Sequence, residues 1–270
     1  MKSYLFKVLN PEKAEEELLQ CGLQDLYQIE DQETGEVFIG GRSSKELKPR
    51  YSELMNVEQA VDWEEQWAHF AEDFSEGKAH IDLKRFGKKA TLLLQPGPGF
   101  GDLSHPTTEL MLRMMKGRMK SQSIVDIGTG SGILALAALL LGASSAFGID
   151  IDAAALKHAR LNAKINHLQA RFAKKLPAQL SPSIFLLNMI LPEQQTALKR
   201  HLKRYNRLAK LWITSGILAE QKENYLQCTQ SWGWKLKEIH KKKKWLGFVF
   251  RTHLTHTERL LGCFKASKIE

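Results

Sequence analysis

Up to about residue 56, the hydrophobic positions come in short runs that fit strands and one helix. Three segments alternate between apolar and polar residues with a period of two, which predicts strands at 3–9, 26–31 and 36–41. A helix is predicted over 11–22, because Pro11 opens it, acidic residues fill its first turn and Gly22 follows its last turn. A second, weaker helical pattern covers 43–55. These elements predict a small α+β domain over residues 1–56.

The pattern changes twice between residues 57 and 90. Over 57–74, Val61, Trp67 and Phe70 fall near helical spacing with acidic residues between them, which predicts a linking helix. Two short apolar runs follow and predict a hairpin, at 78–84 and 90–95. We therefore interpret residues 57–90 as a linker helix and a hairpin.

From residue 121 onward, apolar runs that fit strands alternate with runs that fit helices. The strand-like runs are 123–128, 145–151, 183–190 and 210–216, and the helix-like runs are 132–143, 153–165, 192–205 and 217–229. This alternation is typical of a parallel, doubly wound sheet. The last two strand-like runs, 234–240 and 245–253, flank a lysine run and should pair as an antiparallel hairpin. The sequence therefore predicts a doubly wound, Rossmann-like α/β domain over residues 91–270, with an antiparallel C-terminal hairpin.

Composition and cysteine spacing narrow the class of protein. Of the 270 residues, 43% are hydrophobic and 26% are charged, as in an ordinary soluble globular protein. The longest apolar stretch, 133–143, is shorter than the roughly 18 residues of a membrane-spanning helix, so we expect no membrane association. Cys21, Cys228 and Cys263 are isolated, so we expect reduced thiols and no metal site. Because the first residues do not resemble a secretory signal, we expect a cytoplasmic protein.

Charge is distributed unevenly along the chain, whose net charge is +9. Residues 1–80 carry 8 Lys and Arg against 18 Asp and Glu, whereas residues 199–270 carry 17 against 5. Such a division indicates partners rather than a fold. The acidic region suits a basic protein, and the basic region, with its lysine run 241–244 beside Trp245, suits RNA. Both regions are equally compatible with surfaces that are only solvated. The lysine run between two strands is also compatible with a solvated turn.

Two glycine-rich stretches carry the candidate chemistry, PGPGFGDLSHPTT at 96–108 and VDIGTGSGIL at 125–134. In the second, an apolar strand passes into a helix across three glycines, Gly128, Gly130 and Gly132. Glycine lets a backbone approach a ligand closely, and a helix N-terminus offers unpaired N–H donors. Asp150 ends the next strand, at the offset where a carboxylate meets a ribose diol in dinucleotide folds. We predict a nucleotide-type cofactor site here.

The residues around this loop limit which cofactors the site could bind. Asp126 would repel a pyrophosphate but suits an ammonium group, and the third glycine comes one position early for the dinucleotide pattern GxGxxG. S-adenosylmethionine carries an α-amino group and a ribose diol but no phosphate, so D-x-G-x-G-x-G favours this methyl donor over NAD. Asn188, at the end of the strand-like run 183–190, either holds an amine nucleophile or caps the next helix.

These residues resemble a known family. DIGTGSGILALAAL, GIDID and ITSGILAEQ, together with Asn188, are similar to class I S-adenosylmethionine-dependent methyltransferases. More narrowly, PGPGFGDLSHPTT and VDWEEQW are similar to the PGLAFGTGTHPTT loop and the DWE-x-x-W linker helix of the PrmA family, the bacterial ribosomal-protein-L-eleven methyltransferases. The resemblance covers about residues 60–250.

The resemblance implies an S-adenosylmethionine-dependent N-methyltransferase that acts on lysine ε-amines or the α-amine of a basic ribosomal protein. Residues 1–56 would be its substrate-recognition domain, and we expect a monomer. The implied cofactor-binding positions are Thr108, Asp126, Gly128, Gly130, Gly132, Asp150 and Asn188, with Asp126 orienting the methionine ammonium. Asn188 and His105 are the candidate catalytic residues. His105 either accepts a proton or packs in the turn beside Pro106. Because methyl transfer is displacement at an activated carbon, it needs positioning more than a strong acid–base pair.

The first glycine-rich stretch departs from the family pattern at its centre. Asp102 and Leu103 stand where the family loop has Thr and Gly. The cofactor site is kept on its glycine and ribose side, the expected acid near the adenine is lacking between the helix-like run 153–165 and Asn188, and the substrate side is altered. Two alternatives therefore stay open beside the ribosomal-protein methyltransferase: an RNA or small-molecule methyltransferase of the same fold, and a cofactor-binding homologue without catalysis.

Overall fold

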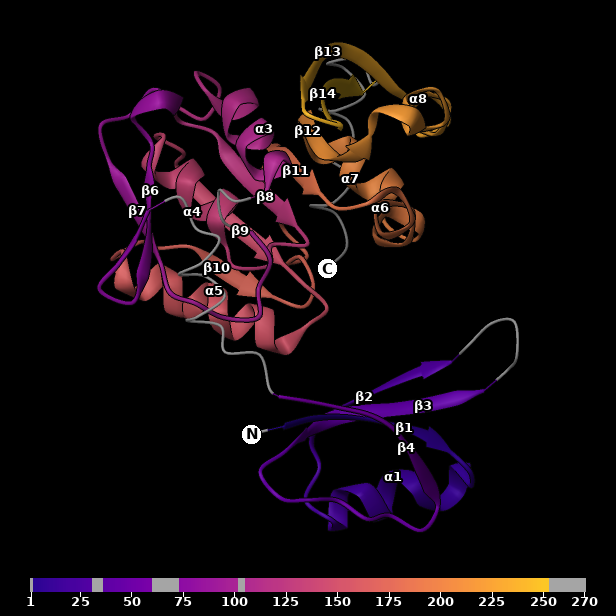
Figure 1. Cartoon of the computed structure of the whole chain (residues 1–270). Helices are drawn as coiled ribbons and strands as arrows, with labels where there is room; N and C mark the ends of the chain where they lie inside the picture. The colour runs from indigo at the N-terminus through magenta and orange to yellow at the C-terminus, as the bar shows by residue number, and fades with distance from the viewer. Residues whose placement is uncertain (1, 31–35, 60–72, 102–104, 253–270) are drawn as a thin grey trace, which may run out of the picture. The chain divides into compact units, whose positions relative to one another are not determined.

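The computed structural model describes residues 2–30, 36–59, 73–101 and 105–252. The chain divides into two compact units, Met1–Asp62 and Trp63–Glu270, which are described separately (Figure 1). Asp102, Leu103 and Cys263 lie outside the described residues. Within the described ranges, no helix is long and apolar enough to cross a membrane. In the same ranges, no group of His, Cys, Asp and Glu side chains is arranged to hold a metal ion.

The first unit is a four-stranded antiparallel sheet with one helix packed on it. The strands are β1 (Lys2–Val8), β2 (Gln24–Glu30), β3 (Val37–Ser43) and β4 (Ser52–Gln59), in the order β2-β3-β1-β4. Helix α1 (Pro11–Gln20) connects β1 to β2 and begins at the predicted proline. Its buried Ala14 and Leu18 pack against Tyr4 and Phe6 of β1, so the sheet buries one face against the helix.

The weak helix predicted at 43–55 is wrong. Ser43 ends β3, and β4 begins at Ser52 and pairs with β1. The end of this segment forms a strand in spite of its helical pattern, because β4 completes the backbone hydrogen bonding of β1. Periodicity along the sequence cannot reveal such a tertiary contact. The linking helix predicted at 57–74 lies mostly outside the described residues, and its described ends belong to β4 and to β5 (Phe74–Ser75).

The second unit contains a seven-stranded, mostly parallel sheet. Its strands are β8 (Ser123–Ile127), β9 (Ser145–Ile149), β10 (Arg171–Ala173), β11 (Ser183–Asn188), β12 (Ala209–Leu218), β13 (Trp234–Lys242) and β14 (Trp245–Thr252), in the order β10-β9-β8-β11-β12-β14-β13. Strands β8 to β12 are parallel, and β14 is antiparallel to both β12 and β13. This confirms the predicted Rossmann-like sheet with its C-terminal hairpin. The strand order reverses between β8 and β11, which is where such sheets bind ligands.

Helices cover both faces of this sheet (Figure 1). One face packs against α3 (Pro106–Met115), α4 (Ile133–Leu140) and α5 (Ala153–Ile165), and the other against α6 (Leu191–Lys199), α7 (Leu202–Leu208) and α8 (Lys222–Ser231). Neighbouring strand residues contribute to opposite cores: Ile124 of β8 belongs to the first and Val125 to the second. This alternation explains why the strands read as continuous apolar runs.

Two helix boundaries differ from those predicted. The run 192–205 forms two helices, α6 and α7, and the run 217–229 becomes helical only from Lys222. The second difference arises because β12 continues to Leu218, which pairs with Trp245 of β14. A 3₁₀ turn at Ala219–Gln221 then leads into α8.

A small three-stranded sheet precedes the larger one. The predicted hairpin is confirmed as β6 (Lys78–Asp82) paired with β7 (Thr91–Leu94), with β5 on its edge and a 3₁₀ turn, η1 (Lys84–Phe86), between the two longer strands. Strand β7 leads directly into the first glycine-rich stretch. The hairpin thereby sets where that stretch begins.

Candidate functional site

The two glycine-rich stretches are bonded to each other beside the carboxyl end of β8. The Ser131 backbone N–H donates to the Phe100 carbonyl over 2.9 Å, and the Ser131 hydroxyl donates to the Gly101 carbonyl over 2.6 Å. Gly130 has a positive φ of 54°, and a Cβ there would collide with the Phe100 carbonyl oxygen. The close approach therefore requires glycine at this position. The two stretches form one structure, not two separate turns.

Asp126 lies at the end of β8, with 1% of its surface exposed. Its Oδ2 accepts a hydrogen bond from the Thr129 hydroxyl over 2.7 Å, whereas its Oδ1 is buried and has no hydrogen-bond partner among the described residues. Burial, aided by the nearby negative charge of Asp150, raises the pKa of Asp126 to about 7. A cation bound at Oδ1 would offset that burial and favour the carboxylate.

Asp150 follows β9 and is fixed by backbone donors. Its Oδ2 accepts from the Gly130 N–H and its Oδ1 from the Asp152 N–H, each over 3.0 Å. Each carboxylate oxygen can accept a further hydrogen bond. The side chain is half-buried at the edge of the glycine loop, so an incoming hydroxyl pair would meet an acceptor that is already oriented.

Asn188 ends β11, the strand that pairs with β8. Its Oδ1 is buried without a hydrogen-bond partner in the described part of the chain. The alternative role as a helix cap is wrong, because α6 starts at Leu191 with Ile190 as its N-cap and has no side-chain cap. A Cβ on Gly128 would meet Met189, so the loop passes close to this strand end.

Thr108 and His105 lie at the start of α3. His105 is the N-cap, and its Nδ1 contacts the Thr107 hydroxyl at 2.7 Å and the Thr107 N–H at 3.4 Å. Its ring packs edge-on between those of Phe100 and Trp245, with centroids 5.4 and 5.0 Å away. The Thr108 side chain is fully buried, and its hydroxyl has no hydrogen-bond partner within the described ranges.

In the described part of the second unit, three side-chain oxygens from three elements are therefore buried without a hydrogen-bond partner: Asp126 Oδ1 of β8, Asn188 Oδ1 of β11 and Thr108 Oγ1 of α3. Leaving a buried polar atom unpaired is costly, and such atoms are normally hydrogen-bonded. Strands β8 and β11 are neighbours, and α3 packs against β11. The donor and acceptor chemistry fits a polar ligand with an ammonium group and hydroxyls.

Sequence reasoning missed a polar stripe on α5. His158, Asn162 and Asn166 are spaced by four residues and share one face of the helix. Asn162 accepts from the Gln95 N–H over 2.9 Å and donates to the Ser131 carbonyl over 2.8 Å. Asn166 bonds both the N–H and the carbonyl of Leu93. The sequence signal that could have revealed this stripe is the presence of polar residues on a helix face that should be buried.

The lysine run also differs from a simple solvated turn. Lys242 forms an ion pair with Glu109 of α3, a residue with only 1% of its side chain exposed, and Arg113 pairs with the same carboxylate over 2.6 Å. Lys241, Lys243 and Lys244 are exposed. One lysine therefore anchors the hairpin to α3, while the other three face solvent.

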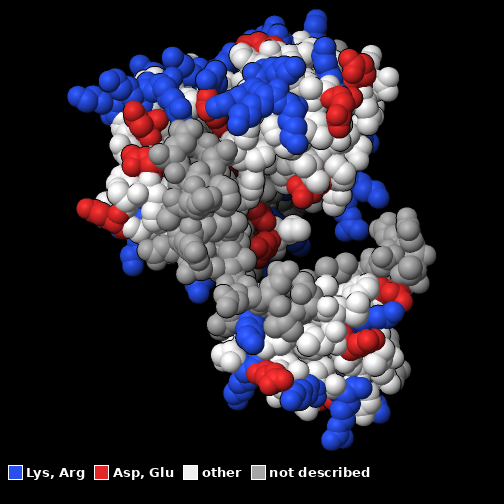
Figure 2. All heavy atoms as spheres, viewed as in Figure 1, with Lys and Arg blue, Asp and Glu red and all other residues white. Residues whose placement is uncertain are grey.

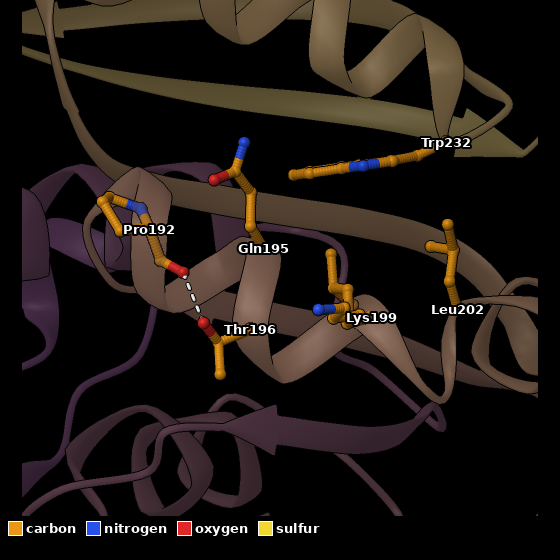
Figure 3. A pocket seen from close by; sticks show the side chains of 7 residues that line it. Pro192, Gln195, Thr196, Lys199, Leu202 and Trp232 are labelled. Atoms are coloured by element: carbon orange, nitrogen blue, oxygen red, sulfur yellow. Dashed lines mark hydrogen bonds between the residues drawn. The ribbon is translucent and has the colours of Figure 1, made fainter.

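A separate hollow of about 530 Å³ lies between α6 and the end of α8. The Trp232 ring faces Gln195 across it, and the Thr196 hydroxyl donates to the Pro192 carbonyl over 2.9 Å (Figure 3). Lys199 and Leu202 complete the lining shown there. None of the sequence-predicted site residues borders this hollow.

The fold and the glycine loop define a class I methyltransferase, whose cofactor is S-adenosylmethionine. The family model described as "Ribosomal protein L11 methyltransferase (PrmA)" matches residues 8–253. The chain therefore belongs to the ribosomal protein L11 methyltransferase family, as its motifs predict.

Individual relatives agree. The chain is 30% identical over 236 residues to the ribosomal protein L11 methyltransferase of Dictyoglomus thermophilum, covering 81% of this chain and 78% of that one. It is 29% identical over 242 residues to the enzyme of the same name from Aquifex aeolicus, covering 87% and 94%. The crystal structure of ribosomal protein L11 methylase from Lactobacillus delbrueckii subsp. bulgaricus superposes with a TM-score of 0.53 at 26% identity, over 61% of this chain and 87% of that one.

Proposed function

We propose that this protein transfers methyl groups from S-adenosylmethionine to amino groups, lysine ε-amines or the α-amine, of ribosomal protein L11. The observation that carries the proposal is the set of three buried, unpaired oxygens beside the glycine loop. The names of the relatives supply the substrate. We assign the activity to the cytoplasm and expect the protein to act as a monomer.

The cofactor would be held by the residues around the two loops. Asp126 binds the methionine ammonium, Asp150 the ribose hydroxyls, and Thr108 closes the site from α3. The glycines leave the loop backbone open to the ligand: Gly128, Gly130 and Gly132. When bound, S-adenosylmethionine supplies a methyl group on a positively charged sulfur, which makes the carbon open to displacement.

The chain's own residues then position the amine. Asn188 Oδ1 accepts a hydrogen bond from the neutral substrate amine and aims its lone pair at the methyl carbon. The methyl group that S-adenosylmethionine would supply would pass to this nitrogen as the C–S bond breaks, and the surplus proton on nitrogen would pass to water. We assign His105 to positioning, because its Nδ1 caps α3 through Thr107 and its ring packs between Phe100 and Trp245.

Three parts of the chain have separate roles in this proposal. Residues 1–56 recognise the substrate, and residues 57–90 link this domain to the rest of the chain. Residues 91–270 bind the cofactor and catalyse methyl transfer. The acidic first part docks the basic ribosomal protein.

We propose in addition that the basic C-terminal third contacts RNA. Support for this contact comes from the exposed lysines of β13 and its turn: Lys235, Lys237, Lys241, Lys243 and Lys244. Figure 2 shows Lys and Arg gathered over the end of the second unit where Figure 1 places β13 and α3. Retention on immobilised RNA at moderate salt, lost on replacing Lys241 and Lys243 by Glu, would support the contact. Equal retention of the variant would contradict it.

Transfer of labelled methyl groups to total ribosomal protein tests the function. We expect label in one small ribosomal protein, identified as L11 by mass spectrometry. Asp150→Ala should raise the KM for S-adenosylmethionine by about tenfold or more, since it removes two oriented acceptors. Asn188→Ala should lower kcat by about a hundredfold, since it removes the amine-positioning group, and should also weaken cofactor binding, since Asn188 is one of the expected cofactor-binding positions.

Asp152→Ala is the matched control for Asp150. The Asp152 carboxylate accepts from the Ala154 N–H over 2.8 Å and caps α5, two residues away from Asp150. It should cost about 1 kcal/mol of stability and leave cofactor affinity unchanged. Full activity in either site variant, or label only in RNA, would contradict the proposed roles.

A further inference from the structure

His158 lies in the middle of α5, where its ring fits between two glycines of the first glycine-rich stretch. It is 4% exposed. A Cβ on Gly97 would come within 2.8 to 2.9 Å of three atoms of this ring, and a Cβ on Gly99 within 2.7 Å of its Nδ1. The ring therefore fills the space that a side chain at Gly97 would need, and at Gly99 it does so together with the Gly130 and Ser131 backbone, whose nearest atoms would lie 2.6 Å from the Cβ. At Gly97 the three nearest atoms all belong to His158, so a side chain there would first meet this imidazole.

Both ring nitrogens of His158 are used by the same stretch. Nδ1 accepts from the Gly99 N–H over 3.1 Å, and Nε2 donates to the Gln95 carbonyl over 2.6 Å. A neutral imidazole with its proton on Nε2 satisfies both bonds at once. Burial lowers the pKa of His158, which keeps the ring in that neutral form. The side chain thus connects two backbone positions four residues apart.

The segment that His158 holds is the one that supports the cofactor loop. Directly after Gly99, the Phe100 and Gly101 carbonyls accept from the N–H and the hydroxyl of Ser131. One turn along α5, Asn162 bonds both Gln95 and Ser131. The backbone at Gly130 and Ser131 is therefore braced by a segment that is itself fixed on α5.

We propose that His158 is a positioning residue for the cofactor: it fixes residues 97–101 in the conformation that shapes the Gly130–Ser131 loop for S-adenosylmethionine. The proposal rests on the assignment of that loop to cofactor binding. His158 does not touch substrate or cofactor. Its contribution is pre-organisation, so its loss should appear in cofactor affinity more than in the rate of the bound complex.

The test compares His158→Ala with two conservative variants in the full-length protein. Titration calorimetry with S-adenosylmethionine should give a Kd raised by about tenfold or more for His158→Ala, with kcat at saturating cofactor within about threefold of wild type. His158→Asn retains an acceptor near Nδ1 for the Gly99 N–H, so it should recover part of the lost affinity. His158→Gln, which keeps its polar group nearer the Nε2 position, should recover less.

Asn166→Ala is the matched control. It removes two hydrogen bonds between the same helix and β7 but leaves residues 97–101 untouched. We expect it to lower the unfolding temperature without changing the Kd. If His158→Ala behaves like Asn166→Ala, with lower stability and a Kd within about twofold of wild type, the role is only structural and the proposal is wrong.

A double-mutant cycle tests the contact itself. Gly97→Ala should weaken cofactor binding because its Cβ displaces the His158 ring, and in a His158→Ala background it should cost little more. Additive losses would overturn the proposal. Hydrogen exchange distinguishes a failure of the His158 proposal from a failure of the proposed methyltransferase function. Even if the wild type bound no S-adenosylmethionine, the Gly99 amide should exchange faster in His158→Ala than in wild type, and equal rates would refute the link.

Discussion

A carboxyl group enclosed at the end of β8 should make cofactor binding depend on pH. The pKa of Asp126 is raised to about 7 mainly by burial. Below that pH the group is neutral and cannot pair with an ammonium, so the affinity for S-adenosylmethionine should fall as the pH drops from 8 to 6. Asp126→Asn should bind about tenfold or more weakly at pH 8. Its affinity should vary less with pH over this range, as calorimetry at several pH values would show.

The same pKa shift also makes the stability of the protein depend on pH, in the opposite direction to the cofactor affinity. Because the folded pKa of Asp126 lies above the ordinary value of 3.8 for an aspartate side chain, the folded state holds its proton more tightly than the unfolded state. The cofactor-free protein should therefore lose stability as the pH rises from about 4 to about 7. Asp126→Asn should remove that loss and melt higher than the cofactor-free wild type at pH 8. A lower melting temperature would show that the carboxylate is stabilised by other means.

Some of the candidate site residues could be predicted from the sequence, and others could not. Glycines and an acid at fixed spacing were enough to predict the loop around Asp126 and the cofactor class. Roles that depend on contacts between distant segments were not predictable: a side chain at Gly97 would meet His158, 61 positions along the chain. Asn188 could not be separated from a helix cap until the start of α6 was known.

At the scale of elements, one buried ion pair fastens the C-terminal hairpin to α3. Glu109 is nearly inaccessible and faces Lys242 of β13. Glu109→Gln removes the carboxylate that pairs with both Lys242 and Arg113. Since Lys242 is 29% exposed and can turn toward water, we expect a loss of about 1–2 kcal/mol, less than for a fully buried pair, in urea denaturation. Lys241→Ala, an exposed change in the same run, should stay within about 0.5 kcal/mol. Equal losses in the two variants would deny the ion pair a structural role.

Strands that are buried on both faces could be predicted from the sequence, whereas segments whose conformation depends on pairing with a distant strand were ambiguous. The strands β8, β9 and β11 are continuous apolar runs because both faces are buried, and they were found from the sequence. Strand β4 was mistaken for a weak helix because its partner β1 lies some 50 residues earlier. The end of β12 was missed for the same reason, since its last residues are held by β14.

For the molecule as a whole, the division of charge predicts how substrate affinity responds to salt. If the acidic first unit docks a basic ribosomal protein, raising the salt from 50 to 500 mM should increase the KM for that substrate, since screening shortens the range of attraction to a few Å. The KM for S-adenosylmethionine and the kcat should change much less, because the Asp126 and Thr108 side chains that would hold the cofactor are buried. Initial-rate kinetics with purified ribosomal protein measure all three.

Charge reversal locates the docking surface. Glu15 and Glu16 are exposed on α1, so reversing both to Lys should raise the substrate KM several-fold and flatten its salt dependence. The matched control reverses Lys241 and Lys243 in the exposed turn of the hairpin. With a protein substrate free of RNA, this control should leave the KM unchanged or lower it, because added acids attract a basic partner. A KM that rises in the control and not in the α1 variant would assign docking to the basic end of the chain and refute the role of the first unit.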